Sequence, residues 1–201
     1  SGFNGEWAGA FASSDAGLDQ LWQESLNTLA ICMRDTYMDC PERERGPYMG
    51  DASNQIDAAL YSYDQAGLDM TKKAILACVA WTRADGAIPS RAPSVKPQEI
   101  PNQSLIFMTS VYHYWLHSGD RETAAAYCGA FLNYLKLVEM EDGLPVYREG
   151  SWTWNDWGDC IDTQLLQAGI YYYALNVTKS MADDLGVTEG TEFLTERMDS
   201  M

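Results

Sequence analysis

Apolar residues recur at the spacing of an α-helix along almost the whole chain, and this periodicity constrains the fold more than any other feature. Six stripes of this kind begin at Leu18, Ile56, Leu68, Leu105, Tyr127 and Leu165. A seventh helix is predicted near Thr188. The last long stripe ends at Gly186, and glycine often follows a helix C-terminus because it adopts a left-handed backbone without strain. The pattern predicts an all-α protein of six to seven helices.

The composition supports one buried core. Of the 201 residues, 46% are hydrophobic and 12% aromatic, so the chain has enough apolar side chains to fold, and disorder is excluded. Lys and Arg number 13 against 29 Asp and Glu, which gives a formal net charge of −16. A surface this acidic repels phosphates and anionic lipid headgroups, so we expect neither nucleic acid nor a membrane as partner. No apolar run approaches the ~20 residues of a membrane span.

The start of the chain and its cysteines carry two further expectations. The chain opens with Ser1 and Gly2 instead of Met, and no cationic segment followed by an apolar one is present. We therefore expect no signal peptide and a start within a longer gene product. The five cysteines are odd in number and contain no C-x-x-C pair, so we expect buried thiols, and neither a disulfide framework nor a zinc site.

The connections between the predicted helices alternate in length. Short turns are expected at residues 65–67 and 118–120, and long loops at residues 35–51, 83–103 and 140–161. Antiparallel helix pairs stacked side by side place short turns on one face and long loops on the other. Because binding and catalytic residues are often carried by loops on a rigid scaffold, we expect a site among the long loops.

The first long loop concentrates charge within seventeen residues, 35–51. Its charged residues are Asp35, Asp39, Glu42, Arg43, Glu44, Arg45 and Asp51. A solvated charged turn would explain the charges alone, but prolines and glycines at positions 41, 46, 47 and 50 also shape the backbone around them. Carboxylates fixed among arginines also suit a glycosidase, since like charges raise the pKa of one carboxyl to make a general acid. We expect Asp51 or Ser53 to cap the next helix.

The third long loop contains three tryptophans. Trp152, Trp154 and Trp157 are interspersed with Asn155, Asp156 and Asp159. Indole faces stack on the C–H faces of sugar rings, and carboxylates and amides bind ring hydroxyls, so the composition fits a carbohydrate subsite. A buried aromatic corner with aspartates that cap the local backbone fits the same composition. The residues by themselves leave both interpretations open.

The histidines offer a third pattern, which we interpret as structural. His113 and His117 stand four residues apart on a predicted helix, a spacing seen in metal sites. The residues between them lack the glutamate of a metalloprotease, and no third ligand is evident. No metal site and no cofactor are therefore predicted.

Together, the motifs resemble a known family. Residues 34–45 read Arg-Asp-Thr-Tyr-Met-Asp-Cys-Pro-Glu-Arg-Glu-Arg, and Gly50-Asp51 follow. This segment resembles the signature of the bacterial α-L-rhamnosidases of glycoside hydrolase family 78. Further segments agree in order and spacing at residues 85–89, 100–105, 118–120, 157–159 and 171–174. The resemblance runs from about Leu18 to Gly186.

The resemblance implies roles for individual residues. It makes Glu44 the general acid and makes Asp39, Arg43 and Asp51 the groups that hold rhamnose hydroxyls. The aromatic wall of the sugar pocket would come from Tyr48, which stands in Pro47-Tyr48 where the family usually has Gly-Trp, so the preferred sugar is open to change. The remaining substrate-binding residues implied are Trp152, Trp154, Trp157 and Asp159. The family's catalytic base is a glutamate far downstream, and Glu189, Glu192 and Glu196 do not match it.

The resemblance also implies the architecture. The family's catalytic domain is an (α/α)6 toroid of twelve helices, so residues 1–201 would be a single partial domain, its N-terminal half. The complete enzyme would hydrolyse terminal α-L-rhamnosides with inversion, in the bacterial cytoplasm or periplasm, without a cofactor. Alternatives are another (α/α)6 glycosidase and a non-catalytic carbohydrate-binding module. Uncovered helix flanks of a half toroid predict self-association. Because only one of the two carboxyl groups that inversion needs can be placed, the isolated chain is expected to have no significant activity.

Overall fold

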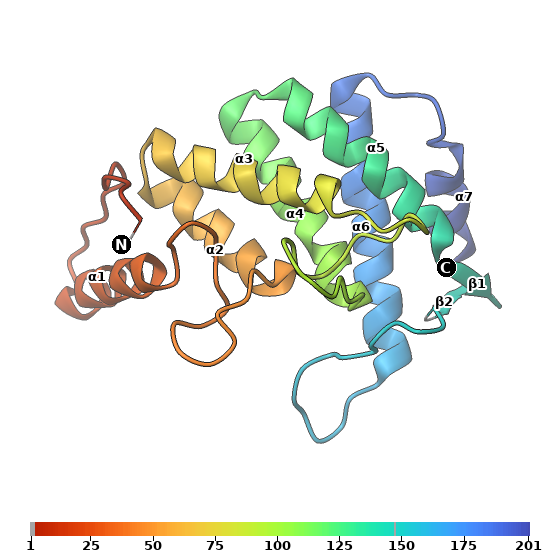
Figure 1. The fold of residues 1–201 in the computed structure, drawn as a ribbon, viewed down its shortest axis with the longest axis horizontal. Coiled ribbons are helices and arrows are strands. Elements are labelled where there is room, and N and C mark those ends of the chain that lie inside the picture. Colours follow the sequence, from red (N-terminus) through yellow and green to blue (C-terminus); the bar gives the residue numbers. More distant parts are fainter. Residues whose placement is uncertain (1–2, 147) are drawn as a thin grey trace.

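The computed structural model describes residues 3–146 and 148–201, and most of them are helical (Figure 1). The helices are α1 (Ala16–Ile31), α2 (Met49–Ser62), α3 (Gln65–Ala80), α4 (Pro101–Ser118), α5 (Arg121–Leu137), α6 (Thr163–Leu185) and α7 (Glu192–Ser200). Two short strands, β1 (Glu139–Glu141) and β2 (Leu144–Val146), form an antiparallel hairpin after α5. The predicted all-α class and the predicted helices are confirmed. The hairpin lies inside the third long loop, where the sequence pattern did not predict strands.

Short polar side chains and glycines set most helix ends. The N-cap carboxylates that accept a backbone N–H are those of Asp15, Asp64, Asp120 and Asp162. Gly119 and Gly186 follow α4 and α6 with positive φ, 66° and 65°, so the expected C-cap at Gly186 is confirmed.

Two predictions of helix boundaries were wrong. The helix α2 begins at Met49 with Tyr48 as N-cap and no side-chain cap, so neither Asp51 nor Ser53 caps it. Asp51 instead lies in the first helical turn. Residues 65–67 form the first turn of α3, because Asp64 caps that helix one residue earlier than the expected turn.

The helices form two rows around a common core. The helix α4 packs between α2 and α6, while α3 packs against α5 and α7 packs against α6. Aromatic side chains fill the space between α4 and α5, where the rings of Phe107 and Tyr127 meet edge to face and Tyr127 stacks on Phe131. All three are fully buried, so they contribute to one continuous core.

The first helix is less covered than its periodicity suggested. Leu26 and Leu29 of its apolar stripe are buried, but Leu18 and Leu21 remain 49% and 58% exposed. They are exposed because α1 contacts mainly α2 and no other helix of the described chain covers its outer face. The α1 flank is therefore an open edge of the helical array.

The cysteines are free thiols, but not all are buried. Cys32, Cys78 and Cys128 lie in the interior, whereas Cys40 is half-buried and Cys160 is exposed. The expectation of five buried thiols was therefore wrong for the two cysteines in long loops. Burial raises the pKa of the Cys128 thiol to about 11, which keeps it protonated and unreactive.

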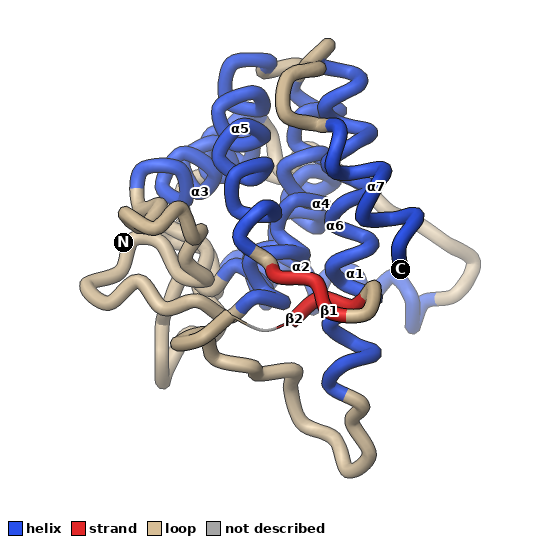
Figure 2. Tube along the Cα trace, turned by 90° about the vertical axis from the view of Figure 1, so that its right-hand side faces the viewer, coloured by secondary structure: helices blue, strands red, loops and turns tan. Residues whose placement is uncertain are grey.

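The long loops gather beyond the helix ends. Figure 1 shows the loop before α2 and the loop before α6 projecting at the lower edge, and Figure 2 shows loops projecting below the helices from a second direction. Among the described residues, none of the helices combines the length and the apolar character needed to cross a membrane. The loop-rich end is thus where the candidate site residues are found.

Candidate active site

Residues 39–46 form a closed loop between α1 and α2. The Asp39 carboxylate accepts a hydrogen bond from the Gly46 N–H at 2.8 Å, and the Asp39 N–H donates to the Gly46 carbonyl at 3.0 Å. Arg45 adopts φ 48°, a left-handed conformation that a residue with a side chain seldom takes. These features give the charged segment a defined shape, which a merely solvated turn would not need. We call residues 39–51 the acid loop.

Glu44 has two partners within the acid loop. The Cys40 thiol donates a hydrogen bond to Oε2 of Glu44 at 3.2 Å, and the Glu44 N–H donates to Cys40 Sγ at 3.3 Å. The Arg43 guanidinium pairs with the same carboxylate. Both partners favour the ionised form, so the pKa of Glu44 lies below its ordinary value, first through the hydrogen bond from Arg43 and second through that from Cys40.

Asp51 behaves in the opposite way. Burial raises its pKa above the ordinary value, and repulsion from Asp39 adds to the shift, followed by weaker repulsion from Asp156 and Glu44. The carboxyl whose pKa is raised among like charges is therefore Asp51, and not Glu44, which the resemblance makes the general acid. The site therefore holds one carboxyl with a raised pKa, Asp51, and another with a lowered pKa, Glu44.

Tyr48 is held against a residue of the second long loop. The Arg91 guanidinium lies 5.1 Å from the centre of the Tyr48 ring, and its Nη1 donates to the Tyr48 hydroxyl at 3.2 Å. The two residues also pair through their backbones as an isolated bridge. A cation over a tyrosine face is attracted to the ring, so these contacts fix the ring orientation. The sequence offered no signal for Arg91, because its contact with Tyr48 spans 43 residues.

The tryptophans of the third long loop remain accessible. Trp152 is 47% exposed, Trp157 is 89% exposed, and Trp154 is half-buried. The rings of Trp152 and Trp154 lie 6.0 Å apart and tilted by 39°. A buried aromatic corner is therefore not what this segment forms. We call residues 151–157 the aromatic loop.

The acid loop and the aromatic loop meet around one cavity of about 370 Å³. Its lining consists of Asp39, Arg43, Glu44, Tyr48, Asp51, Ile100, Gln103, Trp152, Trp154 and Trp157. Every residue proposed from the sequence for catalysis or substrate binding is present except Asp159. Asp159 is exposed and lies outside the lining, two residues past the last tryptophan that faces the cavity. A volume of this size suits one sugar ring with bound water.

Two lining residues lacked an assigned role in the sequence analysis. Ile100 precedes α4 and Gln103 lies in its first turn, within the segment 100–105 that contributed to the family resemblance. The Gln103 side chain is buried and its Oε1 has no hydrogen-bond partner. A Cβ at Gly50 would lie 2.9 Å from Cγ of Gln103, so the glycine lets α2 approach this side chain closely.

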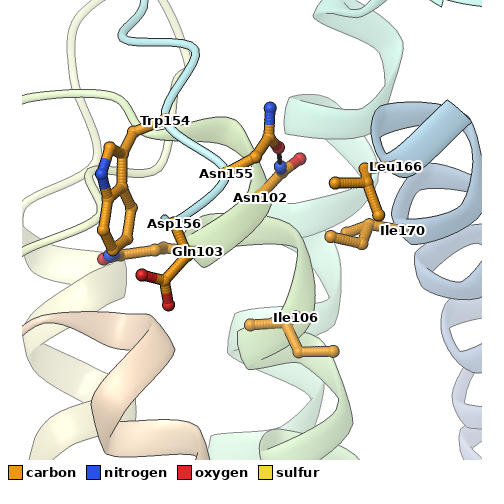
Figure 3. A pocket seen from close by; sticks show the side chains of 8 residues that line it. All are labelled: Asn102, Gln103, Ile106, Trp154, Asn155, Asp156, Leu166 and Ile170. Carbon is orange, nitrogen blue, oxygen red and sulfur yellow. Dashed lines mark hydrogen bonds between the residues drawn. The ribbon is translucent and has the colours of Figure 1, made fainter. Parts of the chain in front are cut away.

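A second cavity of about 250 Å³ adjoins the first through two shared residues, Gln103 and Trp154. Figure 3 shows Trp154 and Gln103 on one side of it and Leu166 and Ile170 of α6 on the other. Asn102 donates a hydrogen bond across it to Asn155. The aromatic loop thus separates a charged cavity from one with a largely apolar wall on α6.

Two groups of side chains have the spacing of metal ligands, and both have structural explanations. Donor atoms within 4.8 Å of one another come from Asp39, Cys40 and Glu44, which the hydrogen bonds of the acid loop already hold together. Nδ1 of His113 lies 2.8 Å from a carboxylate oxygen of Asp57, and Nδ1 of His117 lies 2.9 Å from the His113 carbonyl. The His113 contact joins α4 to α2, so the histidine spacing serves helix packing.

Comparison with protein families gives a match over almost the whole chain. The model described as the bacterial alpha-L-rhamnosidase 6 hairpin glycosidase domain matches residues 6–200. None of the curated proteins matches the sequence. A six-hairpin domain is an α/α toroid, so the match agrees with the predicted partial toroid and with the seven helices found in residues 3–146 and 148–201.

Solved structures share this fold. A GH78 family rhamnosidase of Bacillus sp. GL1 superposes with a TM-score of 0.81 at 24% identity, over 98% of this chain and 21% of that one. A rhamnosidase from Klebsiella oxytoca with rhamnose bound gives 0.83 at 21%, over 98% and 39%. The native α-L-rhamnosidase from Aspergillus terreus gives 0.82 at 17%, over 98% and 24%. The chain therefore spans well under half the length of each of these proteins.

Proposed function

The chain belongs to the bacterial α-L-rhamnosidase six-hairpin glycosidase family, and from this premise we propose that residues 1–201 are the N-terminal half of a catalytic domain that hydrolyses terminal α-L-rhamnosides. The observation that supports the proposal most is the cavity where the acid loop and the aromatic loop meet. Carboxylates and an arginine on one side and indole rings on the other provide the polar and apolar contacts that a sugar ring needs.

Glu44 is the proposed general acid. It lies in the acid loop beside the cavity and its side chain is 28% exposed, so a leaving oxygen can reach it. Its lowered pKa comes mainly from Arg43, whose side chain is 86% exposed and free of packing that would hold it there. When Arg43 turns to a sugar hydroxyl, Glu44 loses its strongest stabilising partner and its pKa rises toward the range of a proton donor.

The sugar is held by the remaining lining residues. Asp39 and Asp51 offer carboxyl oxygens to ring hydroxyls, while Tyr48 and the aromatic loop provide faces for the C–H side of the ring. Asp39 is already oriented by its hydrogen bond from Gly46, so it is preorganised as an acceptor. Asp159 contributes only if the segment after Trp157 folds toward the cavity when sugar binds.

The proposed reaction proceeds with inversion and needs a second carboxylate. In inverting enzymes the two carboxyl groups stand roughly 6.5–9.5 Å apart, one as acid and one as base for the attacking water. Glu189, Glu192 and Glu196 do not line the cavity, so the described chain offers no glutamate at the far end for this role. The base is proposed to come from chain outside these residues, and the isolated chain is expected to bind sugar without turning it over.

A different sugar specificity is the second candidate. Tyr48 presents a smaller ring than the family's usual tryptophan, and Arg91 holds its hydroxyl in place. A smaller ring at this position changes the aromatic wall that a sugar would meet. The same fold would then hydrolyse another glycoside, or bind carbohydrate without catalysis.

The test uses the longest natural polypeptide that contains this chain. Hydrolysis of 4-nitrophenyl α-L-rhamnoside is followed by proton NMR, so that the first anomer released reports the stereochemistry. A β-anomer first supports an inverting rhamnosidase, and an α-anomer first contradicts inversion. A panel of aryl glycosides in the same assay identifies a different sugar, and binding of L-rhamnose without hydrolysis of any member supports the binding module.

A further inference from the structure

Three segments of the chain, the loop between α3 and α4, α5 and the loop before α6, meet at the buried side chain of Glu99. Glu99 lies in the second long loop just before α4 and is only 2% exposed. Its Oε1 accepts a hydrogen bond from the Tyr134 hydroxyl at 3.0 Å, and its Oε2 accepts one from Nη1 of Arg148 at 2.9 Å. Nη1 of Arg83 lies 3.7 Å from the same Oε2. The carboxylate is therefore buried and fully paired, which makes loss of a partner costly.

Arg148 joins this carboxylate to a second one. Its Nη2 donates to Oδ2 of Asp85 at 3.1 Å, and Asp85 is itself fixed by the Ala87 N–H and by Arg83. The guanidinium thus ties together Asp85 and Glu99, which lie near opposite ends of the loop between α3 and α4, with one donor group on each carboxylate. Arginine is suited to this bridge because its planar fork presents donors in fixed directions, which a lysine cannot reproduce.

The same two residues hold the start of the aromatic loop. The Glu99 carbonyl accepts a hydrogen bond from the Trp152 N–H at 2.8 Å. The Arg148 carbonyl accepts from both the N–H and the hydroxyl of Ser151, at 3.1 and 2.7 Å. Ile100, the residue after Glu99, lines the cavity together with Trp152. Side chains and backbone of Glu99 and Arg148 therefore fix two neighbouring parts of the cavity wall.

We propose that Glu99 and Arg148 are positioning residues for sugar binding, because the ion pair between the buried Glu99 and the partly buried Arg148 fixes the aromatic loop over the cavity. Neither residue lines the cavity, so each acts through Trp152 and its neighbours. This inference rests on the proposed function, since it assigns the pair a role in the same sugar site. The position of the tryptophan rings of the aromatic loop then depends on an ion pair that does not itself line the cavity.

The test compares Arg148→Met, Arg148→Lys and the matched control Lys179→Met in the 201-residue chain. Lys179 pairs with Asp183 on the exposed surface of α6, so its replacement removes one positive charge away from the loop. Two measurements are made on each protein: hydrogen exchange of the peptide that covers residues 148–157, and the Kd for L-rhamnose by calorimetry. The thermal midpoint of each variant shows that it is folded.

Arg148→Met is expected to speed hydrogen exchange at the Trp152 amide about tenfold. It should also raise the Kd for L-rhamnose about tenfold. A change of this size corresponds to the loss of one charged hydrogen bond. Arg148→Lys should recover part of both effects, and Lys179→Met neither. Faster exchange with unchanged sugar affinity would overturn the positioning role, and so would unchanged exchange. If the parent chain binds no L-rhamnose while exchange responds as expected, the ion pair does fix the aromatic loop, and the proposed sugar site is wrong.

Should Arg148→Met fail to fold, Glu99→Gln replaces it, because the amide keeps the shape and the contact with Tyr134 while removing the charge. The same two readouts then apply with the same expected direction. A folded Glu99→Gln chain with parent values for both would overturn the proposal.

Discussion

The Cys40 thiol donates a hydrogen bond to Oε2 of Glu44 at 3.2 Å, and the Glu44 N–H returns one to the same sulfur at 3.3 Å. One cysteine thus contacts both the backbone and the carboxylate of the proposed acid, and after Arg43 it is the next contributor to the lowered pKa of Glu44. A donor to the ionised carboxylate lowers its pKa, so removal of the thiol raises it. The pairing also explains why a half-buried cysteine stands in a charged loop.

Cys40→Ala should raise the pKa of Glu44 toward its ordinary value, since the carboxylate keeps Arg43 and loses its second donor. Cys40→Ser should preserve most of the shift because a hydroxyl also donates. Carbon-13 NMR titration of the Glu44 carboxyl measures both variants. An identical titration midpoint in Cys40→Ala and the parent chain would show that the thiol does not act on the charge.

Glu44→Gln should lower turnover in the full-length enzyme by about 10²–10⁴-fold on rhamnosides with poor leaving groups, and by less on activated aryl rhamnosides. The reason is that only a poor leaving group needs a proton as the bond breaks. Glu42→Gln is the matched control, because Glu42 lies in the same loop but does not line the cavity. Equal losses on both kinds of substrate would assign Glu44 to sugar positioning.

Tyr48→Ala should weaken L-rhamnose binding by the 201-residue chain about tenfold, because it removes an aromatic face of the cavity. Rhamnose should also quench or shift the tryptophan fluorescence of the parent chain, since the aromatic loop is exposed to the same cavity. Tyr61→Ala serves as control, as Tyr61 is exposed on α2 and remote from the site lining. Unchanged affinity in Tyr48→Ala would remove Tyr48 from the sugar wall.

Asp51→Asn should stabilise the folded chain near neutral pH and leave it unchanged in acid. Burial and like charges raise the pKa of Asp51, so its ionisation opposes folding once the pH rises through the ordinary carboxyl range. Below about pH 3.9 the carboxyl is largely protonated in the unfolded state as well, and the difference fades. Thermal melts across this range should show a midpoint increase of a few degrees at about pH 7, whereas Asp199→Asn on the exposed end of α7 should show none. A lower thermal midpoint of Asp51→Asn at neutral pH would mean that the ionised carboxylate of Asp51 stabilises the folded chain.

The chain is expected to self-associate through its open helix flanks. Leu21 on α1 is 58% exposed and Leu165 on α6 is 68% exposed, at opposite edges of the helical array. Exposed apolar side chains at an edge favour association. Sedimentation velocity over a range of concentrations should show a mass increase that Leu21→Lys with Leu165→Lys reduces, and that Leu76→Lys on α3 does not. A concentration-independent monomer would rule the association out.

The sequence by itself determined the class of fold and predicted most of the residues that line the candidate cavity. Helical periodicity depends on the 3.6-residue repeat, and helix ends depend on nearby caps such as Asp162 and Gly186, so both are local properties. The acid loop was also evident locally, because its carboxylates, arginines and turn-forming residues are contiguous. One local prediction failed, because Asp51 lies within the first turn of α2 and is not its N-cap.

Only the tertiary structure decided how these pieces work together. The contacts of Tyr48 with Arg91 and of Glu99 with Arg148 join residues 43 and 49 positions apart, and no periodicity encodes such pairs. Packing of α4 between α2 and α6 brings the acid loop and the aromatic loop to one cavity and leaves Asp159 outside it. It also decides which carboxyl has the raised pKa, because burial and distances between charges depend on the folded arrangement.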